Sequence, residues 1–309
     1  MLKGLNSIGS IFIMIAIGFI LAKKGLLDKK TNNLFSKLVV QISLPLMIIS
    51  SLPKNFTLDS LISSSNSLLV AFLIILIGYG LAFLMTLILK IDMKERGVYC
   101  ALFSVGNTNF IGIPINISIF GEKSIPYIFL YYIVNSIFFW TIGVYNIKKQ
   151  SSKSMETGFI VTIKRVFSPP LIGFLLGTLL IVSKINLPEF LDSSFSYIGQ
   201  LSTPLAMLFI GTVIYNIDFK EMKIDLKTVS ILIGKFFILP LTAVLLLSLF
   251  KFPSLLNKVF IVQAAAPIMT QIALVTEYYD VSSKYSSFMV GLSTIVFMFV
   301  LPIYMFFIG

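Results

Sequence analysis

GNTNFIGIP at residues 106–114 and QAAAPIMTQ at residues 263–271 are the two stretches that decide the fold. Both interrupt long apolar segments, and their prolines, Pro114 and Pro267, lie 153 positions apart. Proline removes a backbone donor and clashes with the preceding helical turn, and lipid offers no water to the carbonyl groups that are freed. Two such breaks at corresponding places in two halves of a chain indicate the mid-membrane binding site of a secondary transporter.

The composition around these breaks is that of a membrane protein. Of the 309 residues, 57% are hydrophobic and 12% are charged, and the apolar runs are long and continuous rather than alternating. A membrane-spanning helix needs about 20 mostly apolar residues. We therefore predict an all-α polytopic protein with ten spans, at 6–22, 34–52, 66–89, 97–119, 125–147, 165–183, 194–215, 228–250, 257–278 and 285–307. The first span lacks a small-residue cleavage site and is interpreted as a retained helix.

Cysteine and histidine usage limits the possible chemistry. The single cysteine, Cys100, excludes an intramolecular disulfide and a cysteine-rich metal site, and the chain has no histidine. We predict neither a metal nor a cofactor, and we expect that any proton coupling would need a carboxylate. The sequence also lacks a nucleophile elbow, a phosphate-binding loop and an intramembrane carboxylate pair, so we predict that it is not an enzyme.

The net charge of +11 is distributed unevenly. Most Lys and Arg residues fall in the odd-numbered loops between the predicted spans. The positive-inside rule then predicts a multi-pass protein of the cytoplasmic membrane with both termini outside. Because basic loops next to spans face lipid headgroups, the charge indicates membrane lipid as the partner and no nucleic acid.

Internal symmetry divides the predicted spans into two halves. We predict a first five-helix repeat at 1–147, a cytoplasmic connecting loop at 148–164 and a second five-helix repeat at 165–309. GFIL at 18–21 recurs as GFLL at 173–176, and SLPLMII at 43–49 recurs as STPLAML at 202–208. Together with the breaks, these landmarks have offsets of 153 to 159 positions. Since five is odd, the second repeat would cross the membrane in the opposite sense, as inverted repeats do.

Polar residues cluster at both breaks, at membrane depth. Half-helix N-termini at a break carry partial positive charge that suits an anion, and Asn and Gln amides could orient it. The predicted substrate-binding residues are Asn107, Thr108, Asn109, Gly112 and Pro114 from the first break and Gln263, Ala265, Pro267, Thr270 and Gln271 from the second. The alternative is that these polar groups only hold helices together. Because the first break carries more polar residues, we expect recognition to depend mainly on helix 4.

Further residues inside the spans have two interpretations each. Lys235, in predicted helix 8, either reaches the cytoplasmic surface or compensates the charge of the substrate. Pro45 and Pro204 are either packing kinks or part of a second constellation. Trp140 suits an aromatic belt, whereas the role of Asn135 is left open.

The same motifs resemble those of the auxin efflux carrier family, which includes plant PIN-type carriers and bacterial malonate or malate permeases. NTNFIGIP at 107–114 is similar to that family's Asn-Thr-x-x-x-Gly-x-Pro, and IVQAAAP at 261–267 is followed by Glu277 and Tyr278. The resemblance covers the whole chain. It implies ten helices in inverted repeats, with broken helices 4 and 9 crossing at the site of a small organic anion, a carboxylate.

The resemblance also implies a mechanism. Helices 1, 2, 6 and 7 would form a dimeric scaffold, and the others would move past it in an elevator form of alternating access. The chain lacks the long central loop of many plant members and has Ile272 where they carry a second proline, which favours a bacterial-type carrier. The alternative is a sodium-coupled symporter of the bile-acid-carrier type, in which Thr270, Gln271 and Glu277 could supply oxygen ligands.

Overall fold

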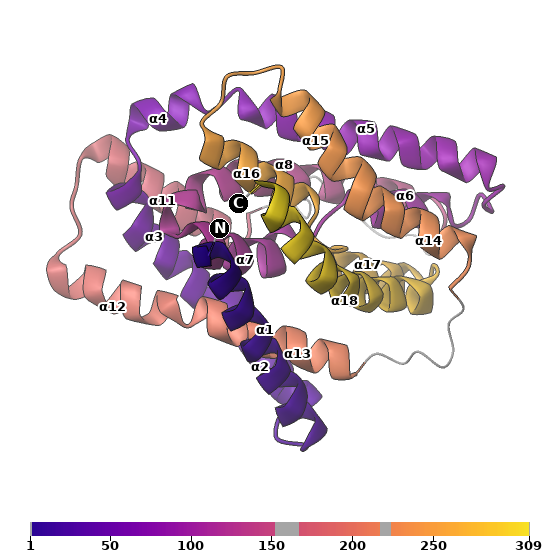
Figure 1. Cartoon of the computed structure of the whole chain (residues 1–309), viewed down its shortest axis with the longest axis horizontal. Helices are drawn as coiled ribbons and strands as arrows, with labels where there is room; N and C mark the ends of the chain where they lie inside the picture. Colours follow the sequence, from indigo (N-terminus) through magenta and orange to yellow (C-terminus); the bar gives the residue numbers. More distant parts are fainter. Residues whose placement is uncertain (1, 152–166, 217–223, 309) are drawn as a thin grey trace.

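The fold, taken from a computed structural model, consists of helices and their connections over residues 2–151, 167–216 and 224–308, which the structure describes (Figure 1). Those residues contain one isolated β-bridge and no named strand. The helices of the first half are α1 (Leu2–Lys23), α2 (Lys29–Leu38), α3 (Leu44–Asn55), α4 (Leu58–Ser63), α5 (Ser67–Ile88), α6 (Arg96–Ser104), α7 (Ile113–Phe120), α8 (Ile125–Phe138) and α9 (Val144–Lys148).

The second half continues from α11 to α18. Its helices are α11 (Pro169–Ser183), α12 (Glu189–Gln200), α13 (Ser202–Tyr215), α14 (Leu226–Ile233), α15 (Leu239–Leu247), α16 (Ser254–Ala264), α17 (Thr270–Tyr279) and α18 (Ser283–Ile308). Short π-helical segments join several of them, at η1 (Val39–Ser43), η2 (Thr108–Gly112), η4 (Phe139–Gly143) and η5 (Gly234–Ile238), and η3 (Glu122–Ser124) is a 3-10 turn. The predicted connecting loop 148–164 lies mostly outside the described residues.

Six helical segments are long and apolar enough to cross a membrane. They are Lys30–Asn55, Leu58–Ile88, Glu122–Lys148, Glu189–Tyr215, Leu226–Leu247 and Ser283–Ile308. Shorter apolar helices occur at Gly9–Lys23, Thr108–Phe120, Pro169–Ser183 and Ser254–Ala264. The prediction of a helical, multi-pass membrane protein is confirmed, whereas the number of ten spans stays a prediction.

Several helix ends follow directly from the local sequence. Asp28 and Asp225 precede α2 and α14, and their carboxylates accept hydrogen bonds from the backbone amides of Thr31 and Thr228. These are N-caps, which satisfy amides that have no partner in the first turn. The hydrogen bond from the Thr31 backbone also holds the pKa of Asp28 below its ordinary value.

One group of helices pairs the two halves of the chain closely. In this first helix group α1 lies along α13, and α3 lies along α11 and α12. A Cβ atom on Gly18 would lie 2.4 Å from Leu208 O, and one on Gly173 would lie 2.8 Å from Pro45 Cα. Only glycine permits these backbone contacts. The repeated landmarks therefore touch crosswise, the glycine of each half meeting the proline-containing segment of the other.

The other helices form a second helix group around the two breaks. In it α5 contacts α6, α8 and α15, while α16 contacts α8 and α15, and α17 contacts α18. Figure 1 shows this group with α5 and α15 along one side and α17 and α18 along the other. Aromatic pairs join the two groups: Phe110 meets Phe209 with ring centroids 4.5 Å apart, and Phe129 stacks on Phe174 at 5.1 Å.

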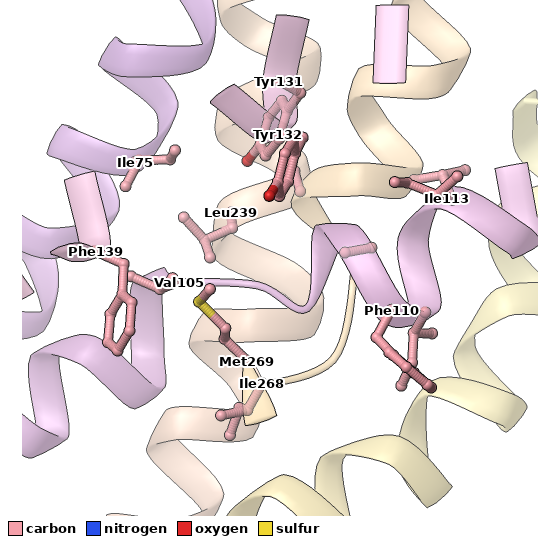
Figure 2. Packing of buried hydrophobic residues seen from close by; sticks show 14 of the residues in the cluster. Ile75, Val105, Phe110, Ile113, Tyr131, Tyr132, Phe139, Leu239, Ile268 and Met269 are labelled. Carbon is pink, nitrogen blue, oxygen red and sulfur yellow. The ribbon is translucent and has the colours of Figure 1, made fainter. Parts of the chain in front are cut away.

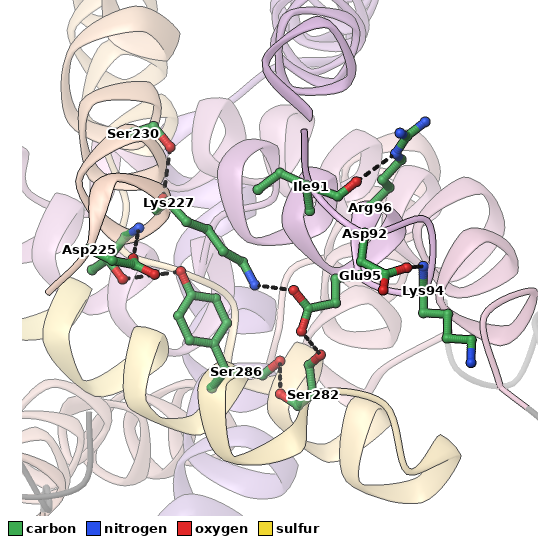
Figure 3. A network of polar contacts seen from close by, with 12 residues as sticks. Ile91, Asp92, Lys94, Glu95, Arg96, Asp225, Lys227, Ser230, Ser282 and Ser286 are labelled. Carbon is green, nitrogen blue, oxygen red and sulfur yellow. Dashed lines mark hydrogen bonds and ion pairs between the residues drawn. The ribbon is translucent and has the colours of Figure 1, made fainter. Parts of the chain in front are cut away.

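A polar network closes one end of the second helix group (Figure 3). Glu95, just before α6, accepts a hydrogen bond from Lys227 of α14 at 2.6 Å and one from Ser282 at 3.1 Å. The Lys227 ammonium also lies 4.2 Å from the ring centroid of Tyr285 in α18. Because Glu95 belongs to the first half of the chain and its partners to the second, the network ties the halves together away from the breaks.

Candidate functional site

The two breaks cross each other inside the second helix group. The chain leaves helical structure after Ser104 at the end of α6 and after Ala264 at the end of α16. Gly106 and Ile268 then form an antiparallel β-bridge. Its hydrogen bonds run from Asn107 N to Pro267 O at 2.7 Å and from Met269 N to Val105 O at 3.4 Å. Segments far apart in the sequence thus satisfy one another's backbone groups where neither is helical.

Prolines and apolar packing explain why the crossing forms here. Pro267 has no N–H to continue α16, and its free carbonyl accepts the bond from the other break. Pro114 lies in the first turn of α7, where a missing N–H is harmless. Figure 2 shows buried apolar side chains around the two connections, among them Val105, Ile268 and Met269.

Asn107 connects the starts of the two helices that follow the breaks. Its Nδ2 donates to Thr270 Oγ1 at 2.9 Å, at the first residue of α17. Its Oδ1 accepts from Phe110 N at 3.1 Å and so caps η2. Both polar ends of this buried side chain are therefore engaged. Asn107 fixes the relative position of η2 and α17.

Asn135 of α8 hydrogen-bonds the first break on the side away from the second break. Its Oδ1 accepts from Gly106 N at 3.1 Å, and its Nδ2 donates to Gly106 O at 2.9 Å and to Thr108 Oγ1 at 3.1 Å. Ser293 of α18 does the same for the second break, since its hydroxyl accepts from Ile268 N at 3.0 Å. Both residues of the bridge thus have their outer backbone amides satisfied by side chains from a neighbouring helix.

From the sequence, the role of Asn135 was open and Ser293 was not among the candidate residues. A signal was available, because the two positions are 158 apart, inside the range of 153 to 159 that the other landmarks share. Polar residues of predicted helices 5 and 10 could have been compared at that offset.

Gln263 places an amide over the first break. Its Nε2 donates to Thr108 O at 3.3 Å, and its Oε1 is buried with no hydrogen-bond partner among the described residues. A Cβ atom on Gly112 would lie 2.1 Å from that oxygen, so glycine is what admits the side chain. The buried Oδ1 of Asn109 and Oε1 of Gln271 are likewise without a partner in the described part of the chain. Such acceptors favour a ligand that can donate a hydrogen bond.

Lys235 brings an ionisable amino group to the crossing. It lies in η5, between α14 and α15, and its side chain is 1% exposed. Its Nζ lies 3.4 Å from Ser104 O, and a Cβ atom on Gly106 would lie 3.1 Å from Nζ. The interpretation that Lys235 reaches the cytoplasmic surface is therefore wrong, because the ammonium group points into the protein next to the first break.

The structure brings most of the predicted site residues together. Asn107, Thr108, Gly112, Gln263 and Thr270 are linked by the contacts above. Pro114 and Ala265 are buried at helix ends. The described residues contain no group of three or more His, Cys, Asp or Glu side chains that could hold a metal ion.

Comparisons with known proteins agree with a transport role. A family model described as a membrane transport protein matches residues 4–305. An uncharacterized transporter of Methanocaldococcus jannaschii is 23% identical over 279 residues, which cover 89% of each chain. An uncharacterized transporter of Methanothermobacter thermautotrophicus is 22% identical over 300 residues, covering 96% of this chain and 95% of the relative. The chain therefore belongs to the membrane transport protein family, which is the auxin efflux carrier family.

Proposed function

We propose that the chain is a secondary carrier of a small organic anion, a carboxylate, which binds where the two breaks cross. The observation that carries the proposal is the buried side chain of Lys235, whose Nζ lies 3.4 Å from Ser104 O beside the first break. An ionisable side chain in a membrane interior is costly and is a functional feature by default. The starts of η2 and α17 add partial positive charge at the same place.

The arrangement of helices supports ten spans in two inverted repeats. The four shorter apolar helices coincide with predicted spans 1, 4, 6 and 9, and the six longer ones with the rest. Gly18 of the first half contacts Leu208 of the second, and Gly173 of the second half contacts Pro45 of the first. The two contacts join equivalent landmarks with the halves interchanged, as a two-fold relation between the repeats would require. Inverted repeats with interrupted helices at their interface are the usual architecture of such carriers.

An elevator mechanism fits the division into two helix groups. The first helix group, which includes Pro45 and Pro204, would be the scaffold of a homodimer, and the second would carry the bound anion past it. The cytoplasmic membrane, with both termini outside, is the location that the charge distribution favours. In this mechanism the aromatic pairs between the groups, such as Phe110 with Phe209, would exchange partners during transport.

Flux measurements test the carrier function. Purified protein in lipid vesicles should transport radiolabelled malonate, malate or indole-3-acetate with saturable kinetics, and protein-free vesicles give the background. Asn107→Ala should reduce the flux, because it releases the start of α17 from η2. Asn55→Ala is the matched control, since the hydrogen bond that the structure gives the Asn55 side chain lies within α3, to Ser51 O at 2.8 Å. Undiminished flux in Asn107→Ala would remove this residue from the site.

A sodium-coupled symporter is the second candidate. One observation favours it. Three buried amide oxygens have no hydrogen-bond partner among the described residues, those of Gln263, Asn109 and Gln271. Hard metal cations such as sodium prefer oxygen ligands. Flux that stays unchanged when sodium is replaced by potassium would exclude it.

A further inference from the structure

Lys235 is buried without a counter-ion among the described residues. Its exposed fraction is 1%, and no Asp or Glu side chain in the described part of the chain is buried. The structure gives its ammonium one hydrogen bond, to the backbone carbonyl of Ser104. That bond is long, at 3.4 Å, and leaves two of the three N–H donors of an ammonium group free for a ligand.

The helices around Lys235 supply no carboxylate. The elements packed against η5 are α5, α6, α14 and α15, and Tyr304 of α18 also donates a hydrogen bond to Phe236 O in η5. The titratable residues on these elements are Tyr79, Arg96, Tyr99, Cys100, Lys227, Lys284, Tyr285 and Tyr304. Every charged residue in this set is itself basic. A negative charge for Lys235 must therefore come from outside this shell.

Burying an unpaired ammonium ion in a membrane interior costs far more free energy than burying the neutral amine. A bound carboxylate reverses the balance, because a charge-assisted hydrogen bond then stabilises the ammonium form. The charge state of Lys235 is thus tied to the presence of the anion at the crossing.

We infer that Lys235 couples transport of the anion to transport of a proton. In the empty carrier the side chain is an amine. When the carboxylate binds, the amine nitrogen takes a proton from the same side of the membrane, forming an N–H bond, and the ammonium pairs with the carboxylate. After reorientation the anion and the proton both leave on the other side, and the amine is regenerated. No electron is transferred. With one proton, a monovalent anion moves without net charge and a dianion such as malonate moves with one net negative charge.

This inference rests on the proposed carrier function and offers an alternative to one expectation from the sequence. There, the absence of histidine implied that proton coupling would need a carboxylate. A lysine can serve equally well when the substrate itself provides the negative charge. Lys235 Nζ lies beside Ser104 O and the unpaired Oε1 of Gln263 lies beside Gly112, both at the first break. The inferred substrate is therefore a carboxylate that carries a second, hydrogen-bond-donating group.

Proton movement is measured directly in the test. Vesicles contain the purified protein and a luminal pH indicator, and malonate is added outside at equal pH. We expect the lumen to acidify, with about one proton entering per malonate when the radiolabel uptake is compared with the pH change. An acidic outside should also drive malonate above its equilibrium level, and a protonophore should abolish that accumulation.

Three variants separate binding from coupling. Lys235→Met removes the charge and should lower malonate flux about ten- to hundredfold, the range expected for a lost charge-assisted hydrogen bond. Lys235→Arg keeps a permanent charge, so binding should survive while proton movement is lost. Lys251→Met is the control, because Lys251 is exposed and lies outside the site.

Calorimetry gives a second readout that needs no flux. Malonate binding in two buffers of different ionisation enthalpy should show uptake of about one proton by the native protein and none by Lys235→Arg. Malonate flux without proton movement would overturn the coupling and leave the carrier function standing. Proton movement that persists in Lys235→Met would also overturn it. No saturable flux of malonate, malate or indole-3-acetate would overturn the proposed function and this inference together.

Discussion

Replacing Asn135 by leucine should destabilise the crossing more than replacing Ser293 by alanine. Asn135 is fully buried and makes three hydrogen bonds, to Gly106 N, Gly106 O and Thr108 Oγ1. Gly106 cannot replace these bonds elsewhere, since its bridge to Ile268 pairs the flanking residues and leaves its own amide and carbonyl facing α8. Leucine has a similar size but no polar atom.

The expected cost follows from the groups that lose their partners. A buried backbone donor or acceptor without a partner costs about 1–3 kcal/mol, so the two backbone groups of Gly106 together cost about 2–6 kcal/mol. Ser293→Ala removes the partner of one amide, that of Ile268, and should cost about 1–3 kcal/mol. The two variants should therefore rank in this order.

Cys100 makes the measurement direct. It is the single cysteine of the chain, it is buried, and it lies in α6 just before the first break. A thiol-reactive fluorogenic reagent will label it when α6 opens on heating. We expect the midpoint of labelling to fall by roughly 2 °C or more per kcal/mol. Asn55→Leu is the control, because it makes the same chemical change at a single local bond, from Asn55 Nδ2 to Ser51 O within α3. Equal midpoints for Asn135→Leu and Asn55→Leu would refute the reasoning.

Two further predictions concern the fit of Gln263 and the network at the other end of the second helix group. Gly112→Ala should push Gln263 away from Thr108 O, since the new Cβ would lie 2.1 Å from Oε1. This change should lower malonate flux, and the loss of the partner of Thr108 O should lower the free energy of unfolding by about 1–3 kcal/mol. Gly80→Ala, where nothing lies within 4 Å, should leave flux unchanged, and equal flux in both variants would contradict the argument. Glu95→Gln should lower stability by less than about 1 kcal/mol, because its ion pair with Lys227 is partly exposed. That loss of stability should shrink at high salt. A loss as large as that of Asn135→Leu would contradict the small contribution expected of the Glu95 network.

The sequence predicted the place of the crossing because proline acts locally. Pro267 and Pro114 can be recognised in a single chain, since the absence of an N–H has the same consequence in any membrane helix. The polar residues beside them, Asn107 and Gln263, can be predicted to lie inside the protein, because a polar side chain that faces lipid is costly. Each of these inferences needs only the residues within one segment.

The supporting residues could not be predicted in the same way. Asn135 lies 29 positions from Gly106 along the chain, and nothing in its own segment says which backbone group it meets. Lys235 was placed by counting residues from the end of a predicted helix. Counting gives depth but not direction, and the structure points the ammonium toward α6 rather than along the helix to the surface. The π-helical turn η5, which contains Lys235, cannot be recognised from the run of apolar residues that predicts the span.

The distribution of unpaired atoms changes which break matters for recognition. The larger number of polar residues in the first break favoured helix 4 as the main recognition element. In the structure, however, both ends of Asn107 are engaged by Thr270 and Phe110. Gln263 keeps a buried oxygen without a partner among the described residues, and Lys235 keeps free N–H groups. A ligand gains most from groups that lose no existing bond when they bind it. Recognition should therefore depend on Lys235 and the second break, with Asn107 setting the positions of the helix ends.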